Sequence, residues 1–288
     1  MSDPTLRPAG KKFLPPTPNT RSKTLIFLLL AALYVLAVLV FGLCMDESRY
    51  GVAYADKFLA PGLEHPFGTD FLGRDMFYRS IKGLSASLVI GLLAAGVSSV
   101  LALALGIAAA AKGGKLDQLI NFAVDCCMGL PHLLLLLLIS FMLGRGVKGV
   151  AVAVALTHWP ELTRVVRAEV LQIRSAQYVQ AAYKMGKSKL WVAKAHLLPQ
   201  VLPVYLVGLV LLFPHAIMHE AALTFLGFGL PAESPAIGAI LAEAMAHIAT
   251  GKWWLALFPG LMLLALVILF DLIAEYLKKL LNPGSGNV

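Results

Sequence analysis

The sequence predicts an all-α integral membrane protein with six transmembrane helices. Of its 288 residues, 59% are hydrophobic and only 14% are charged, which is too apolar for an ordinary soluble domain. The hydrophobic residues are gathered in long stretches that polar segments separate. Such stretches are typical of a chain that crosses the membrane repeatedly.

The first span is expected at residues 24–44, which carry no charge and are long enough to cross the hydrocarbon core. Because a basic, proline-containing leader (residues 1–23) precedes it, a signal peptide is the alternative. We interpret the segment as a retained span. Its apolar stretch exceeds the roughly 7 to 15 residues of a signal peptide, and no cleavage site of small residues follows.

The other five spans are expected at about residues 87–111, 121–143, 149–164, 202–226 and 253–277. The fourth is short and contains His158 and Pro160, so we expect its helix to continue into the cytoplasm. Residues 24–280 then form a single transmembrane domain, which the tail 281–288 follows.

The distribution of basic residues predicts the orientation of these spans. The leader has five Lys and Arg residues against Asp3, and the segment from Arg164 to Lys194 has seven against Glu169. Since such segments stay in the cytoplasm, both termini and residues 174–199 are expected inside, and the mixed-charge residues 45–83 outside. The net charge of +8 therefore reflects topology, and nucleic acid is not expected as a partner.

The cytoplasmic segment 174–199 carries a spaced motif of small and turn-forming residues. Alanines let a short helix sit close to a partner, and a glycine allows a sharp turn beside it. The motif resembles the E-A-A loop with which ATP-binding-cassette importer permeases grip their ATPases, with Gln180 replacing Glu and His196 replacing Ile. Its matching positions are Gln180, Ala181, Ala182, Gly186, Leu198 and Pro199. The alternative is an ordinary cytoplasmic helical hairpin.

A second motif, residues 65–75, precedes the second span and reads H-P-F-G-T-D-F-L-G-R-D. Thr69 or Asp70 can cap the following helix, and Arg74 with Asp75 can lock the segment onto a neighbour. The string resembles a segment of the dipeptide, oligopeptide and nickel permease family, and residues 223–229 resemble that family's S-F-L-G-L-G element. The motif residues expected to be structural are Gly68, Thr69, Asp70, Gly73, Arg74 and Asp75.

The resemblance covers about residues 24–280 and implies a permease subunit of a type I importer with a cytoplasmic coupling helix. Its implied partners are membrane lipid, a second permease, two ATPases and an extracytoplasmic binding protein, in the bacterial cytoplasmic membrane. ATP and Mg would be held by the ATPases, so no catalytic residue and no cofactor are expected in this chain. Closure of the ATPases would act through the coupling loop to switch the permeases between inward-facing and outward-facing states.

Polar residues inside the spans are the candidates for substrate contact. His215 and His219 lie one helical turn apart with Met218 on nearly the same face, and His158 lies in the fourth span. Imidazoles and a thioether suit a soft or borderline metal. The H-x-x-x-H spacing and the triplet Thr157-His158-Trp159 resemble the nickel-type permease.

These features lead us to predict import of nickel or a nickel chelate through weak contacts, without a stable metal site. Import of dipeptides and oligopeptides is the alternative, and histidines that only bridge helices are the structural explanation. A transporter or channel driven by an ion gradient is a different class of function. It would need no loop for an ATPase.

Overall fold

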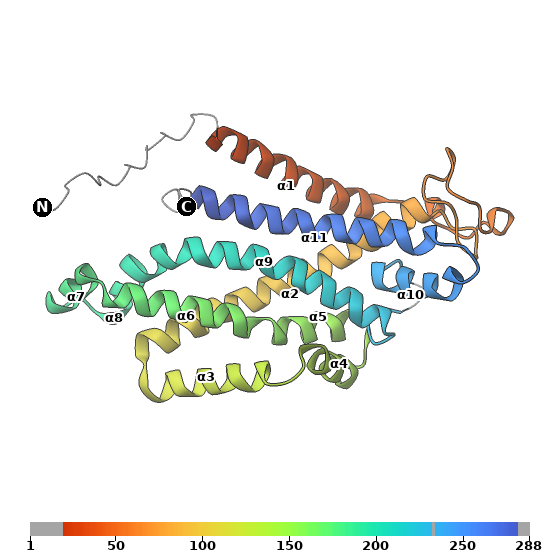
Figure 1. Cartoon of the computed structure of the whole chain (residues 1–288). Coiled ribbons are helices and arrows are strands. Elements are labelled where there is room, and N and C mark those ends of the chain that lie inside the picture. Colours follow the sequence, from red (N-terminus) through yellow and green to blue (C-terminus); the bar gives the residue numbers. More distant parts are fainter. Residues whose placement is uncertain (1–19, 232–233, 282–288) are drawn as a thin grey trace, which may run out of the picture.

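The computed structural model describes residues 20–231 and 234–281, so residues 1–19 of the predicted leader and the tail from residue 282 lie outside the described residues. Every regular element in the described part is a helix, and the long helices run side by side in one bundle (Figure 1). The helices are α1 (Thr20–Cys44), α2 (Met76–Lys112), α3 (Gly114–Met128), α4 (His132–Met142), α5 (Gly146–Thr157), α6 (Trp159–Ser175), α7 (Gln177–Lys184), α8 (Lys189–Val192), α9 (Leu198–Phe225), α10 (Ile237–Ile248) and α11 (Trp254–Leu281).

Four helical segments of the described part are long and apolar enough to cross a membrane: Ser22–Cys44, α2, Lys189–Phe225 and α11. A fifth crossing results if α3 and α4 count as one span. The two helices are bent by 93°, so the single helix predicted for residues 121–143 is wrong. Pro131 explains the break, because it has no N–H to donate and disfavours a helical conformation at the residue before it.

The predicted fourth span is likewise two helices, α5 and α6, which meet at His158. The prediction of one helix over residues 149–164 is therefore wrong, although α6 does continue to Ser175. Pro160 is the physical cause, since it offers no N–H to the carbonyl of Leu156 four residues earlier.

Side chains satisfy the carbonyl groups at this break. Four donors act there: Thr157 Oγ1 to Ala153 O (2.9 Å), His158 Nδ1 to Val154 O (2.8 Å), Ser98 Oγ to Ala155 O (2.5 Å) and Trp159 Nε1 to Leu156 O (2.9 Å). An unpaired carbonyl inside a membrane costs several kcal/mol. The triplet at residues 157–159 therefore has a structural role in the helix break.

Helix α2 lies at the centre of the bundle and contacts α1, α5, α6, α9 and α11. Its buried face consists largely of glycine, alanine and serine. A methyl group added at Gly91 would lie 2.6 Å from Ile217 of α9, and one at Gly106 would lie 2.7 Å from Val166 of α6. Small residues thus let the neighbouring helices approach α2 closely.

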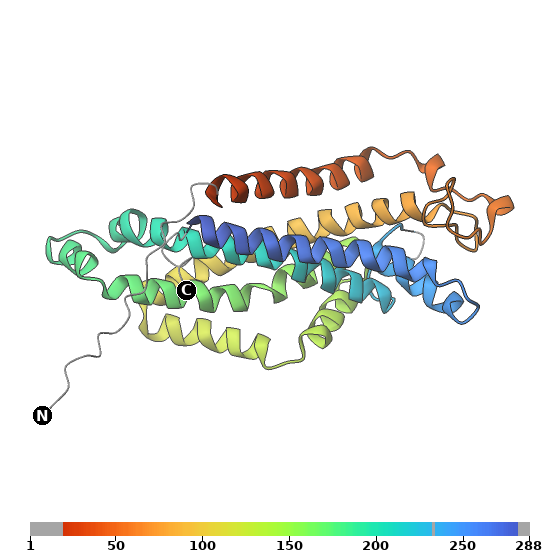
Figure 2. The same ribbon diagram turned by 45° about the horizontal axis from the view of Figure 1, so that its top comes forward.

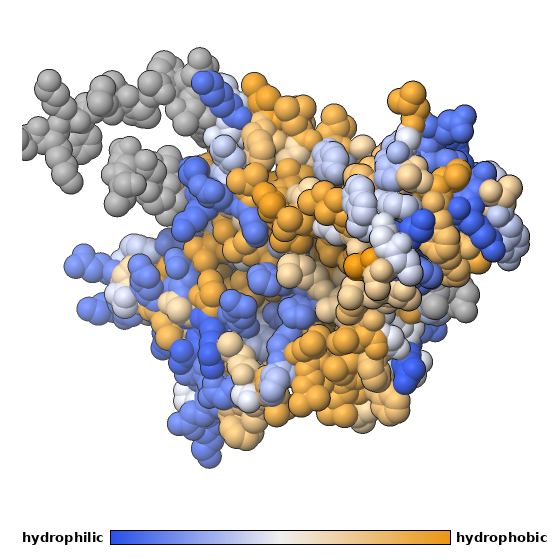
Figure 3. All heavy atoms as spheres, turned by 45° about the vertical axis from the view of Figure 1, so that its right-hand side comes forward, coloured by the Kyte–Doolittle hydropathy of each residue, from blue (hydrophilic) through white to orange (hydrophobic). Residues whose placement is uncertain are grey.

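The polar parts of the chain lie at the two ends of the bundle. The start of α1, the end of α11, and helices α7 and α8 share one end, while residues 45–75 and α10 lie at the other (Figures 1 and 2). On the face that Figure 3 shows, large hydrophobic patches lie between these ends, with polar residues among them. α1 and α11 are largely exposed, which suits contact with lipid or with another membrane subunit.

Four charged side chains clamp the expected outer end. Arg74 bonds Asp70 (Nε to Oδ2, 2.6 Å) and Glu243 of α10 (Nη2 to Oε2, 2.8 Å). Arg79 Nη1 on α2 lies 3.1 Å from Asp70 Oδ2 and 2.8 Å from Glu243 Oε2. Asp70 and Arg79 are each only 2% exposed. The cluster ties residues 65–75 to both α2 and α10.

The cap of α2 differs from the prediction. Asp75, rather than Thr69 or Asp70, accepts hydrogen bonds from the backbone N–H groups of Phe77 (2.8 Å) and Tyr78 (3.3 Å). Thr69 instead holds the preceding loop, since its hydroxyl accepts from Leu59 N (2.8 Å) and donates to Asp56 O.

The two glycines of this motif occupy turns with positive φ. Gly68 has φ 70° and Gly73 has φ 77°. A side chain at Gly73 would collide with the backbone of Ala53, so only glycine fits there.

Replacing Asp70 by Asn should destabilise the subunit by about 3–5 kcal/mol, because Arg74 and Arg79 would each lose one of their two carboxylate partners. Thermal unfolding of the purified protein measures this loss. The matched control is Glu275→Gln, which breaks the exposed pair with Lys279 and should change stability little. Equal stability of Asp70→Asn and wild type would contradict a stabilising clamp.

The orientation predicted from charge can be tested by cysteine labelling. In a background without Cys44, Cys126 and Cys127, a cysteine at the exposed position Glu64 should react with an impermeant reagent in intact cells, and one at exposed Lys187 only after lysis. Labelling of position 187 from outside would contradict the topology.

Candidate functional site

The predicted coupling segment folds as the short helix α7, a turn, and the short helix α8 at the expected cytoplasmic end (Figure 1). Val179 and Ala182 on α7 are buried in the main hydrophobic core, 0% and 3% exposed. Gln180 and Ala181 face outward, and Gln180 Nε2 donates to the carbonyl of Arg174 (2.8 Å). One face of α7 is therefore held by the body of the protein, while the other is open.

Gly186 ends this helix with φ 80°. Its N–H donates to the carbonyl of Tyr183 (3.0 Å), and the N–H of Lys187 donates to Ala182 (3.1 Å). Such bonds are typical of a helix that ends at a glycine in the left-handed conformation. No atom outside the turn lies within 4 Å of a Cβ placed at Gly186, so backbone conformation alone disfavours other residues there.

Two side-chain hydrogen bonds connect this segment to the long helices. Arg174 Nη1 donates to Ala110 O near the end of α2 (2.7 Å), and Tyr178 Oη donates to Gln200 Oε1 on α9 (2.6 Å). Leu198 and Pro199 form the first turn of α9, where a proline needs no N–H partner. A displacement of α7 would thus reach α9 directly through Tyr178, and α2 through Arg174 of α6, whose carbonyl accepts from Gln180.

Large hydrophobic side chains are exposed on the same segment. Met185 is 72% exposed, Leu190 68%, Tyr178 44% and Trp191 43%. These residues lie at the polar end of the bundle, where lipid tails do not account for their exposure, and an exposed apolar patch marks a contact surface. The sequence motif did not single out these four residues, although Leu190 and Trp191 interrupt a run of lysines.

Replacing Gly186 by Val should keep the subunit in the membrane but uncouple it from the ATPase, because a β-branched residue is strained at positive φ by about 1–3 kcal/mol. Substrate-stimulated ATP hydrolysis of the purified complex measures the loss. Gly186→Asn is the matched control, since asparagine tolerates this conformation. Equal coupling in the two variants would refute the role of the turn.

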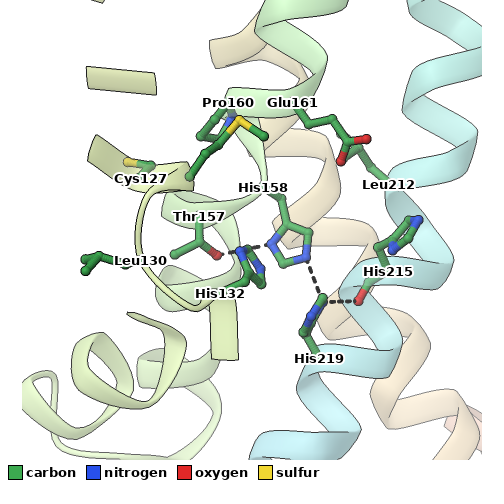
Figure 4. A pocket seen from close by; sticks show the side chains of 11 residues that line it. Cys127, Leu130, His132, Thr157, His158, Pro160, Glu161, Leu212, His215 and His219 are labelled. Atoms are coloured by element: carbon green, nitrogen blue, oxygen red, sulfur yellow. Dashed lines mark hydrogen bonds between the residues drawn. The ribbon is translucent and has the colours of Figure 1, made fainter. Parts of the chain in front are cut away.

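A second candidate site is a cavity of about 270 Å³ at the level of the two helix breaks (Figure 4). Helix α9 contributes Leu212, His215 and His219, while the other lining residues come from the two breaks and their flanks. These are Cys127, Met128, Leu130, His132, Thr157, His158, Pro160 and Glu161. The breaks and α9 therefore place polar side chains around one cavity inside the bundle.

Three imidazole rings meet in this cavity. His158 Nε2 lies 3.1 Å from His219 Nδ1, and the His132 ring centroid lies 4.8 Å from that of His158 and 4.5 Å from that of His219 (Figure 4). His158 is 6% exposed. The sequence motifs did not predict His132 as a substrate contact. Its position could have indicated one, because an ionisable residue directly after a proline in an apolar stretch is unusual.

Of the other two predicted substrate residues, the structure places one in the cavity and one outside it. His215 lines the cavity, but Met218 does not and is 48% exposed. The structure therefore places the two histidines in the cavity and the thioether of Met218 outside it.

Comparison with known proteins decides the family. Residues 102–283 match the family described as "Binding-protein-dependent transport system inner membrane component". The chain belongs to this family. It is thus a multi-pass inner-membrane permease of an ATP-binding-cassette importer, whose ATPase activity lies in partner subunits and whose substrate arrives on a binding protein.

Relatives of this permease have names that describe peptide transport. A "Putative peptide transport system permease protein" of Brucella suis biovar 1 (strain 1330) is 36% identical over 258 residues, which cover 90% of this chain and 86% of the relative. The "Dipeptide transport system permease protein DppC" of Bacillus subtilis (strain 168) is 33% identical, with coverage of 78% and 70%.

A solved structure supports the fold of this permease. The "MetNI methionine ABC transporter", in an inward-facing conformation, contains a chain that matches with a TM-score of 0.58 and 19% identity. The match covers 72% of this permease and 97% of that chain. The predicted importer permease fold is therefore confirmed, although the described helices give four or five apolar spans and not a clear six.

Proposed function

We propose that this permease forms half of a translocation pathway for dipeptides and short oligopeptides, together with a second permease. The observation that carries this proposal is the set of relatives at 30–36% identity, whose names describe peptide, dipeptide or oligopeptide transport. Two ATPases would provide the energy, and an extracytoplasmic binding protein would deliver the peptide.

The names of these relatives do not support nickel, which the sequence predicted as the main substrate. Its H-x-x-x-H argument also weakens, because His219 pairs with His158, and His158 caps the carbonyl of Val154. Import of nickel or a nickel chelate remains the second candidate, and the group of three imidazoles favours it.

The coupling segment supports the ATP-driven mechanism. The outward face of α7, with Gln180 and Ala181, and the exposed Met185 and Leu190 offer an apolar surface to a groove on the ATPase. The bonds of Arg174 and Tyr178 would transmit movement of that groove to α2 and α9. Closure of the ATPases would then shift the two helices that flank the pathway.

The cavity at the helix breaks supports the passage of a peptide. A neutral imidazole can donate or accept one hydrogen bond, as can a peptide group. His215 and His219 present such groups on one side, while Leu212 of the same helix is apolar. A few exchangeable polar contacts in an apolar wall would let a peptide pass without holding it tightly.

Uptake by proteoliposomes that contain the complete complex tests this proposal. A labelled dipeptide should accumulate only with ATP and the binding protein, other dipeptides should compete, and free nickel should not. Accumulation of nickel without uptake of any peptide would contradict the proposal and make nickel the leading candidate substrate.

The same assay tests the cavity. Changing His215 and His219 together to alanine should lower peptide uptake by up to about tenfold, the value of one lost hydrogen bond of up to 1.5 kcal/mol, while the complex still assembles. Leu211→Ala, a change on the same helix outside the cavity, serves as the control. Unchanged uptake by the double variant would remove the cavity from the pathway.

A further inference from the structure

The three histidines of the cavity come from three separate elements of the fold. His132 is the first residue of α4, His158 lies at the junction of α5 and α6, and His219 belongs to α9 (Figure 4). One nitrogen of each ring lies within 4.8 Å of those of the other two. Such a triad differs from the two-histidine contact expected from sequence, because it offers a complete set of three protein ligands.

Hydrogen bonds assign the tautomers of two rings. His158 Nδ1 lies 2.8 Å from Val154 O, and His219 Nδ1 lies 2.8 Å from His215 O. Only an N–H can pair with a carbonyl oxygen, so Nδ1 carries the proton in both rings and Nε2 carries a lone pair when the ring is neutral. A backbone carbonyl that orients an imidazole in this manner is the usual support of a metal ligand.

The third ring has a nitrogen without a partner. Nε2 of His132 is buried and forms no hydrogen bond with any described residue. A buried polar atom without a partner is costly, and a ligand that accepts its lone pair would remove this cost. Glu161 and Cys127 also line the cavity, so further donors are close by for a fourth position.

We propose that His132, His158 and His219 form a site for a divalent transition metal of the Zn²⁺ and Co²⁺ class, and that the bound ion holds the permease in one conformation. Tetrahedral coordination with bonds of about 2.0–2.1 Å needs nitrogens about 3.4 Å apart. The nitrogens lie within 4.8 Å of one another, so binding requires rotation of the rings, and His219 Nδ1 would have to give up its contact with His158 Nε2 so that His219 presents a lone pair.

The holding effect follows from the position of the ligands. One ion would connect α4, the junction of α5 and α6, and α9, so a switch between inward-facing and outward-facing states that shifts these elements relative to one another would have to break a bond to the ion. A ligand that binds only one of two states moves the population toward that state. The metal is therefore an inhibitor of transport in this proposal, and not its cargo.

Metal binding to the complete complex, purified without a histidine tag, is the first test. Titration with Co²⁺ alone should produce the strong visible absorption of tetrahedral cobalt, with one more ion bound per copy of this chain than in His132→Gln. The affinity should fall at least about tenfold in His132→Gln and in His219→Gln. His215→Gln, in the same cavity but outside the triad, should keep the affinity of wild type.

Equal Co²⁺ binding by all four proteins would overturn the site. Should His132→Gln fail to assemble, electron paramagnetic resonance of Cu²⁺ bound to the wild type decides, because three coupled imidazole nitrogens are expected. Coupling to one nitrogen or none would overturn the site as well.

The second test is peptide uptake with and without Zn²⁺. Zinc should slow uptake by wild type at concentrations that fill the site, and His132→Gln should need at least about tenfold more zinc. Equal inhibition of both proteins, or accumulation of zinc inside the vesicles, would overturn the inhibitory role. If wild type takes up no peptide even when no metal is added, the proposed substrate is refuted, but the result of the cobalt titration still stands.

Discussion

Close packing along α2 is the constraint on which the rest of the structure depends. Lipid tails are as apolar as leucine side chains, so helices in a membrane gain little from hydrophobic contact and must fit each other closely. Gly91 and Gly106 let α9 and α6 approach, and Ser98 donates to a carbonyl of α5. Through these contacts α2 fixes the depth at which α5 ends, and with it the position of His158.

At one helix break, a single histidine both stabilises the backbone and lines the cavity. Pro131 and Pro160 interrupt two spans, and the carbonyl groups freed beside Pro160 require side-chain donors. His158 Nδ1 adds a second donor to Val154 O, which also accepts from the His158 backbone N–H, and Nε2 faces the cavity. The same ring therefore stabilises the break and forms part of the polar cavity.

Sequence patterns predicted the parts of the fold that depend on local chemistry. The apolar stretches gave the long helices, Gly186 falls at a turn with positive φ, and Arg74 joins the outer clamp. The missed features depend on contacts between distant segments. His132 meets His158 and His219 because α3 and α4 bend by 93°, and Arg79 of α2 and Glu243 of α10 join Asp70 and Arg74 from separate parts of the chain.

In the proposed coupling, the outward face of α7 docks on the ATPase, and its movement reaches α9 through Tyr178 and α2 through Arg174 of α6. Site-directed cross-linking in the assembled complex tests it most directly, with a photoreactive residue at the exposed position Ala181. Our account predicts a cross-link to the ATPase subunit that changes in yield when ATP binds, and none from position Glu64 at the opposite end. A cross-link from Ala181 to lipid alone, with no ATPase attached, would contradict it.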